Sequence, residues 1–194
     1  MTLFFPLALL AYTAGSINFS ILVFHLLGKG DPRDRFSKNP GATNVYRQLG
    51  LGWAALVLAL DLGRAAALSA MGMLLVPTAW LPLLAFPLLL GNRYPLFHGF
   101  KGGKGVANFL GFCAVPAPAA ALAACLAWVT AYKIAKQPFI GSFFMIVVLS
   151  AGLLRRTGTS PTAAAGTALC LGLIAWGHRG NVAEWRTRRK QSNS

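Results

Sequence analysis

The stretch Phe100-Lys101-Gly102-Gly103-Lys104-Gly105 combines two lysines and three glycines between strongly apolar segments. A charge near hydrocarbon costs roughly 2.5–3.5 kcal/mol, so lysines at this place need a reason. Glycines at 102, 103 and 105 let the backbone turn sharply and bring bare N–H groups close to a ligand. Lysines that only anchor the membrane edge would account for the charges but not for the glycines. We therefore predict a pocket for an anion, best matched by phosphate, although no Ser or Thr follows Lys104 as a Walker A loop requires.

A second polar stretch runs from Ser37 to Arg47 and includes Asn39. Thr43 or Asn44 is predicted to cap a helix that continues into the next apolar segment. Thr43 and Arg47 are four residues apart and share a helix face. A helix N-terminus with an arginine on the same face suits a phosphate. The alternative is a capped loop whose basic residues only anchor the membrane edge.

A third polar stretch, Gly177-His178-Arg179-Gly180-Asn181, ends the last apolar segment. His178 and Asn181 can face one pocket if the helix continues, although His178 could equally be a residue of the interface. Ser142 is predicted to pack between helices unless it reaches the same pocket. Asp61 and Arg64 lie within an apolar segment, three residues apart, and are expected to form an ion pair. His98 has no evident partner.

Acidic residues are scarce, and this limits the possible chemistry. The chain has only four of them, Asp31, Asp34, Asp61 and Glu184. No carboxylate pair, HExxH pattern or G-x-S-x-G elbow appears, which argues against a hydrolase triad or a metal site. We expect chemistry on an already activated anionic substrate, which the protein would position and stabilise electrostatically.

The composition shows which kind of element must position these residues. The chain has 194 residues, of which 56% are hydrophobic and 11% charged, against about 25% charged in soluble domains. This excludes a soluble enzyme and predicts an all-α polytopic membrane protein. A net charge of +14 would suggest nucleic acid in a soluble protein, but here the basic residues lie between or beyond apolar segments. We therefore expect no nucleic-acid partner.

Seven membrane spans are predicted, or six or five if a short segment is re-entrant. The apolar segments cover residues 3–27, 51–75, 79–97, 105–117, 118–134, 139–154 and 161–177. With the N-terminus outside and the C-terminus cytoplasmic, four groups of basic residues share the cytoplasmic side, and only Arg155 and Arg156 break the pattern. Residues 1–185 are expected to form a single membrane domain, and residues 186–194 a solvated basic tail.

Taken together, these motifs resemble those of a known family. They are Gly15-Ser16-Ile17, Ser37-x-Asn39-x-Gly41-Ala42-Thr43-Asn44-Val45-x-Arg47, Pro95-x-Phe97-x-x-Phe100-Lys101-Gly102-Gly103-Lys104-Gly105-Val106-Ala107, Gly141-Ser142 and His178-Arg179-x-Asn181. The chain resembles the bacterial acyl-phosphate-dependent glycerol-3-phosphate acyltransferases, the PlsY family. The resemblance implies a multi-pass enzyme of the bacterial inner membrane with its active site near the cytoplasmic face.

The resemblance also implies an activity and a set of site residues. The family transfers a fatty acyl group from acyl phosphate to the 1-hydroxyl of glycerol 3-phosphate, which gives lysophosphatidic acid and phosphate. It implies no cofactor, no metal and no obligate protein partner, only the two substrates and membrane lipid. The residues that it assigns to catalysis are Lys104, Arg47, Ser142 and His178. Those that it assigns to substrate binding are Ser37, Asn39, Thr43, Gly102, Gly103 and Asn181.

Several positions depart from the family pattern. Phe36 and Lys38 stand where the family has glycines, Asn92 replaces a histidine, and Asn18 replaces a proline. An inactive membrane relative that binds phosphorylated lipid or metabolite is therefore the alternative. An anion transporter is a third reading, which the clustering of polar groups at one face disfavours.

Overall fold

The computed structural model describes residues 3–192, and its regular elements there are all helical, as predicted. The α-helices are α1 (Phe4–Ser16), α2 (Phe19–Leu26), α3 (Ala42–Leu49), α4 (Leu51–Leu75), α5 (Leu81–Arg93), α6 (Val106–Ala114), α7 (Pro118–Ala135), α8 (Pro138–Thr157), α9 (Pro161–Gly177) and α10 (Arg179–Ser192). Three single-turn 3₁₀-helices complete the set: η1 (Pro32–Asp34), η2 (Thr78–Trp80) and η3 (Leu96–His98). Of the predicted tail, residues 186–192 form the end of α10, and 193–194 lie outside the described residues.

Within residues 3–192, four helical segments are long and apolar enough to cross a membrane: Phe4–Leu26, α4, α7 and α8. At about 1.5 Å per residue, a bilayer core of about 30 Å needs about 20 residues. Helix α9 has 17 residues, α5 has 13 and α6 has 9. The count of seven spans therefore stays a prediction. The short α6 packs against α4, α7 and α8 and buries Phe109 and Phe112 completely.

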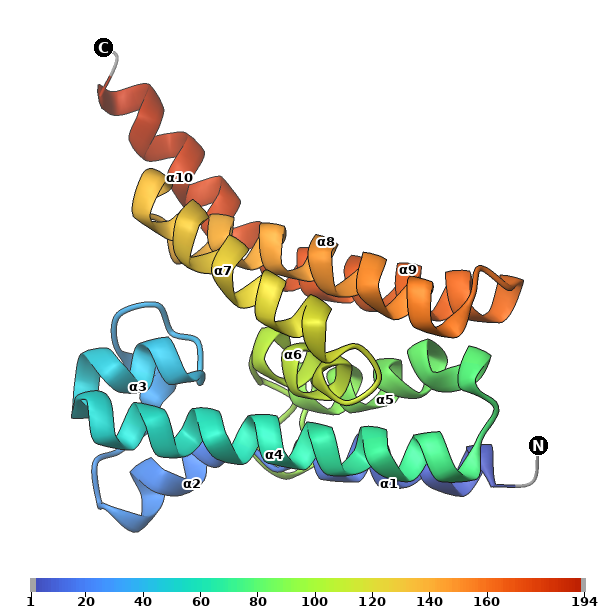
Figure 1. Cartoon of the computed structure of the whole chain (residues 1–194). Helices are drawn as coiled ribbons and strands as arrows, with labels where there is room; N and C mark the ends of the chain where they lie inside the picture. Colours follow the sequence, from blue (N-terminus) through green and yellow to red (C-terminus); the bar gives the residue numbers. More distant parts are fainter. Residues whose placement is uncertain (1–2, 193–194) are drawn as a thin grey trace.

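The long helices lie alongside one another, with α1 packed on α5, α5 on α9 and α7 on α8 (Figure 1). Glycine permits the closest of these contacts. A Cβ atom on Gly15 would lie 2.2 Å from the carbonyl oxygen of Leu88, and one on Gly91 would lie 2.1 Å from that of Tyr12. The backbones of α1 and α5 therefore meet directly, as small residues at a helix–helix interface permit.

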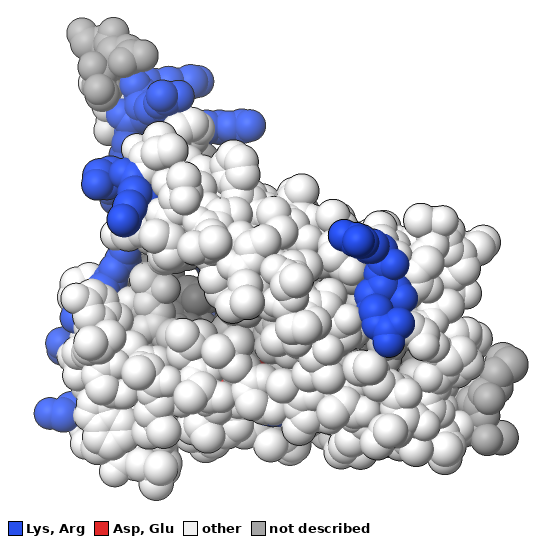
Figure 2. All heavy atoms as spheres, viewed as in Figure 1, with Lys and Arg blue, Asp and Glu red and all other residues white. Residues whose placement is uncertain are grey.

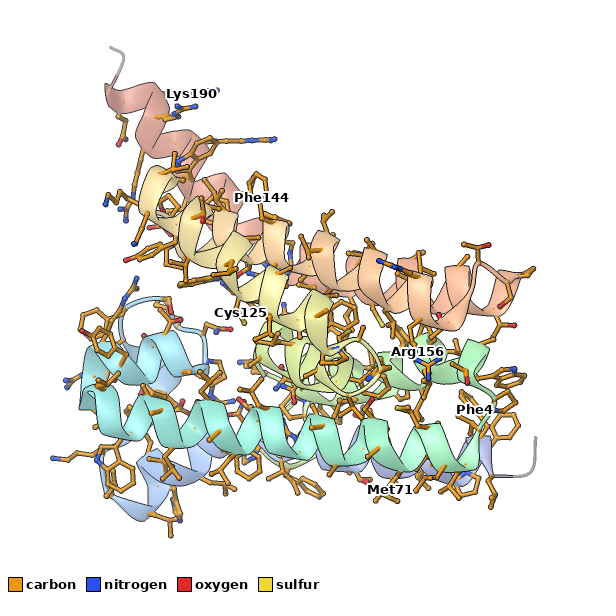
Figure 3. All side chains as sticks on the ribbon, in the orientation of Figure 1. Phe4, Met71, Cys125, Phe144, Arg156 and Lys190 are labelled. Carbon is orange, nitrogen blue, oxygen red and sulfur yellow. The ribbon has the colours of Figure 1, made fainter. Side chains whose placement is uncertain are left out.

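The basic residues gather toward one end of these helices. In Figure 2, Lys and Arg atoms line the left end of the molecule and continue along α10, with one separate group toward the other end. Figure 3 places Lys190 on α10 and Arg156 near the opposite end, on the side of Phe4. This distribution agrees with the predicted grouping of charges and with Arg155 and Arg156 as its exception. Which end faces the cytoplasm stays a prediction.

Asn18 interrupts the first apolar segment between α1 and α2 and connects two loops. Its side chain accepts a hydrogen bond from the Ile21 amide at 3.1 Å and donates one to the Pro40 carbonyl at 3.3 Å. Its backbone N–H donates to Nε2 of His98 at 3.3 Å, so the expectation that His98 lacks a partner is wrong. Burial lowers the pKa of His98, which agrees with a neutral ring that accepts this bond. Asn18 thus holds the loops before α3 and after α5 side by side.

Arg33 strengthens the same junction. Its Nη1 donates to the carbonyl of His98 at 2.9 Å and to that of Lys101 at 2.8 Å. Its Nη2 pairs with Asp31 at 2.5 Å, and this hydrogen-bonded arginine lowers the pKa of the carboxyl. The loop that carries Lys104 is therefore fixed to the loop that precedes α3.

Candidate functional site

The loop with Gly102 and Gly103 folds back on the end of α5. The Gly102 amide donates to the Arg93 carbonyl at 3.1 Å, and the Gly103 amide donates to the Asn92 carbonyl at 2.9 Å. The expectation of bare N–H groups at these two glycines is therefore wrong. Their small size has a different use, because a Cβ on Gly102 would lie 2.0 Å from the Asn92 carbonyl oxygen. The glycines let the loop lie flat against α5 and present the next residue, Lys104.

Lys104 meets the C-terminal polar stretch. Its ammonium group donates a hydrogen bond to Oδ1 of Asn181, a residue 77 positions later in the chain. A Cβ on Gly177 would lie 3.6 Å from the Lys104 Cβ, so the end of α9 packs directly on the lysine stem. The glycine-lysine stretch and the third polar stretch therefore meet through this pair.

The environment of Lys104 is cationic and partly desolvated. Burial, together with the nearby charges of Arg93 and Arg47, lowers the pKa of Lys104 to about 8. The influence of Arg47 shows that α3 also contributes charge to this region. An ammonium group held among like charges gains much from a bound phosphate, which restores the favourable interactions that burial removed.

His178 caps the C-terminus of α9 and is buried, with only 2% of its surface exposed. Its Nδ1 lies 2.9 Å from the Ile174 carbonyl oxygen. Because a carbonyl only accepts, Nδ1 must carry the proton, and Nε2 is left as an acceptor. Burial, opposed by the Ile174 hydrogen bond and assisted by the charges of Lys104 and Arg93, lowers the pKa of His178 to about 4. The ring is therefore neutral at physiological pH and offers a lone pair.

Ser142 lies on the buried side of α8. Its hydroxyl donates to the Pro138 carbonyl at 3.1 Å, within its own helix. The next residue, Phe143, stacks at an angle against His178 with ring centres 5.4 Å apart. Ser142 is therefore adjacent in sequence to Phe143, which contacts His178. Its hydrogen bond within α8 agrees with a helix-packing residue. A role of Ser142 in catalysis stays a prediction.

Helix α3 begins differently from the prediction. Its N-cap is Gly41, without a capping side chain, so the assignment of that role to Thr43 or Asn44 is wrong. The Asn44 side chain instead donates to the Pro32 carbonyl at 2.7 Å. Nor does this helix continue into the next one, because Gly50 separates them with φ +86°. Asn44 is needed to hold the preceding loop, and that tertiary bond cannot be seen in a local capping pattern.

The predicted site residues of the second polar stretch, Ser37 to Arg47, lie on its accessible surface. Ser37, Thr43 and Arg47 are exposed and Asn39 is half-buried. Helix α3 thus presents Thr43 and Arg47, four residues apart, without using either to close the fold. Figure 2 shows the molecule hollowed between the α3 and α7 regions, beside the basic end.

Sequence reasoning missed Arg93. It lies in the last turn of α5 and its charge lowers the pKa of both Lys104 and His178. Its position eight residues before the glycine-lysine loop was the available signal. Among residues 3–192, no group of three or more His, Cys, Asp or Glu side chains is placed to hold a metal ion. The groups that converge are cations and an amide, whose donors suit phosphate and a developing oxyanion, and a neutral imidazole that offers an acceptor.

Comparison with known proteins agrees with this chemistry. A family model described as Glycerol-3-phosphate acyltransferase matches residues 5–188. Glycerol-3-phosphate acyltransferase of Pseudomonas aeruginosa (strain LESB58) is 35% identical over 182 residues, which cover 92% of this chain and 93% of the relative. That of Thioalkalivibrio sulfidiphilus is 37% identical over 184 residues, covering 94% and 90%. The crystal structure of PlsY (YgiH), an integral membrane glycerol 3-phosphate acyltransferase in its glycerol 3-phosphate form, matches with a TM-score of 0.87 at 30% identity, over 96% of this chain and 93% of that one.

Proposed function

Because this chain belongs to the glycerol-3-phosphate acyltransferase family of integral membrane enzymes, we propose that it takes its acyl group from acyl phosphate. The acceptor is the 1-hydroxyl of glycerol 3-phosphate, and the products are lysophosphatidic acid and inorganic phosphate. The enzyme works in the bacterial inner membrane with its basic end toward the cytoplasm. No cofactor takes part in this proposal.

The reaction needs little from the protein beyond positioning and charge. The hydroxyl oxygen attacks the acyl carbonyl carbon, and the bond between that carbon and the phosphate oxygen breaks. The departing phosphate takes the hydroxyl proton, so no strong protein base is required. An activated donor of this kind fits a site of cations and neutral hydrogen-bonding groups.

The proposal also assigns a role to each site residue. Lys104, held by Asn181, and Arg47 offset the charge on the transferring and leaving groups. Neutral His178, whose Nδ1 is bonded to the Ile174 carbonyl, is a hydrogen-bond partner that orients the substrate and takes no proton from it. The pocket is completed by Ser142 and by the binding residues of the second polar stretch and of the glycine loop, which are Ser37, Asn39, Thr43, Gly102 and Gly103.

The observation that carries this proposal is the desolvated Lys104 bonded to Asn181 and surrounded by the charges of Arg47 and Arg93. The test measures inorganic phosphate release from purified protein given acyl phosphate and glycerol 3-phosphate. Lys104→Ala should lower kcat by about 10²- to 10³-fold, as loss of one preorganised donor does. Lys133→Ala, which removes an exposed lysine in the last turn of α7, should leave release unchanged. Release at the normal rate by folded Lys104→Ala would remove this lysine from the mechanism.

A further inference from the structure

A second cationic hollow lies beside the site just described. It has a volume of about 330 Å³ and is lined by Arg33, Lys38, Arg93, Tyr94, Phe100, Lys101 and Gly102. Four of these residues are basic and none is acidic. Like charges that share a concave surface repel one another and attract anions strongly.

Within residues 3–192, only Arg33 of these four cations forms an ion pair. Arg33 pairs with Asp31, and its Nη1 donates hydrogen bonds to two backbone carbonyls. The three ion pairs formed by residues 3–192 include neither Lys38 nor Arg93 nor Lys101. Up to three positive charges therefore remain available to a ligand in this hollow.

Arg93 has the clearest need for a ligand. Its Nε is buried and has no hydrogen-bond partner, and its Nη1 reaches the Gly103 carbonyl only at 3.4 Å. An unpaired buried donor costs about 1–3 kcal/mol, more when charged. A guanidinium presents a planar fork that matches phosphate oxygens. Its free donors are thus the part of the hollow that an anion would satisfy best.

Lys38 adds a second, independent sign. It adopts φ +53°, in the left-handed region, and its side chain is exposed. This conformation costs a non-glycine residue about 1–2 kcal/mol. Strain of this kind persists where the surrounding structure holds a residue in place, and it concentrates at ligand-binding segments.

We propose that Lys38, Arg93 and Lys101 form a second phosphate subsite next to Lys104. The group that it takes is a phosphate, from a soluble phosphomonoester or from a phospholipid headgroup. The inference rests on the proposed function, because a reaction between two phosphorylated substrates brings two such groups to one end of the molecule. Arg93 joins the two subsites, since its charge acts on Lys104 and His178 while its side chain lines the hollow.

The test is calorimetric titration of purified full-length protein with inorganic phosphate, in a neutral detergent. The Lys104→Ala background removes the primary subsite, so remaining binding reports on the hollow. Adding Arg93→Gln should weaken that binding by about tenfold, the effect of one charge-assisted hydrogen bond. Lys29→Gln, which removes an equal charge from an exposed residue outside the hollow, should not. Lys38→Gln, at an exposed position, repeats the test if Arg93→Gln fails to fold.

A second arm separates the two sources of phosphate. The same variants are placed in nanodiscs of phosphatidylcholine alone or with phosphatidylglycerol. If phosphatidylglycerol weakens phosphate binding to Lys104→Ala but not to the double variant, a lipid headgroup occupies the hollow. If it has no effect, the ligand is the soluble phosphomonoester. Equal behaviour of the Arg93→Gln and Lys29→Gln variants in both arms overturns the proposal. Because the readout is binding, failure of wild-type turnover would instead count against the proposed function.

Discussion

Lys104 has an electrostatic state that is unusual for a lysine. It keeps one side-chain partner, Asn181, while the positive charges of Arg93 and Arg47 oppose its own. Its pKa of about 8 lies close to physiological pH, so its charge depends on pH in a range where other lysines stay protonated. The acceptor Nε2 of His178 has no such dependence there, because the pKa of that ring is lowered to about 4.

The pH dependence of turnover should therefore show Lys104. As pH rises through about 8, Lys104 of the free enzyme loses its proton and with it the positive charge that attracts phosphate. We expect kcat/KM to be level from about pH 7 and to fall above pH 8. Ionisation of the substrates does not contribute to this fall in kcat/KM, since the second pKa of a phosphate monoester is about 6. Initial rates of phosphate release, corrected for spontaneous acyl phosphate hydrolysis, give the profile.

Lys104→Arg is the matched variant for this profile. An arginine keeps its charge at every pH of the assay, although its fork does not reproduce the bond of an ammonium group. Its activity should be lower, but its kcat/KM should not fall between pH 8 and 10. If kcat/KM of this variant falls above pH 8 as it does in the wild type, a group other than residue 104 titrates.

At the scale of elements, the backbone contact between α1 and α5 positions the loop that carries Lys104. A methyl group on Gly91 would meet the Tyr12 carbonyl oxygen at 2.1 Å. Gly91→Ala should therefore force the helices apart and lower the free energy of unfolding by about 2 kcal/mol or more. Thermal unfolding in detergent measures the loss.

Gly172 provides the control for this contact. It lies within α9, and a Cβ there would meet nothing within 4 Å. Gly172→Ala should be neutral or stabilise by up to about 1 kcal/mol, because alanine favours helix. Equal destabilisation by the two alanines would show that the α1–α5 contact is not specific.

The loop before α3 contains a strained position outside the cationic hollow. Phe36 has φ +52°, in the left-handed region, and is 63% exposed. Burial of its ring therefore does little to offset the backbone strain. Phe36→Gly should raise the free energy of unfolding by about 0.5–1 kcal/mol, the left-handed penalty less the entropy of glycine. Phe36→Ala keeps the Cβ and should show no gain in the same melting experiment. A larger gain for alanine would place the cause in the exposed ring.

At the scale of the whole molecule, the sequence predicts the helical class and the meeting of Lys104 with Asn181, because their motifs are specific. It does not predict the lengths of the inner helices. The hydropathy of residues 105–117 predicts a span, whereas the helix there is 9 residues long and lies against four other helices, α4, α5, α7 and α8. Apolar residues look alike whether lipid or protein surrounds them. Arg93 was missed for a related reason, since only the fold shows that its donors are left unpaired.

The buried Arg64 ties three parts of the molecule together. It pairs with Asp61 of α4 at 2.8 Å, as predicted, and donates to Asn108 of α6 at 2.6 Å. It also donates to the Ala14 carbonyl of α1 at 2.9 Å. A charge that joins α1, α4 and α6 fixes the core against which α5 and the Lys104 loop are packed.

Removing the partner of Arg64 should therefore destabilise the whole fold. Asp61→Ala leaves an arginine buried without its counter-charge, and we expect a loss of about 3–5 kcal/mol. The pair Glu184–Arg188 supplies the control, because it also joins neighbouring helical turns at 2.5 Å but is exposed. Glu184→Ala should change the free energy of unfolding by less than about 0.5 kcal/mol. Denaturation of both variants in one detergent compares them, and a loss in Asp61→Ala no larger than in Glu184→Ala would mean that Arg64 is held by its amide and carbonyl partners alone.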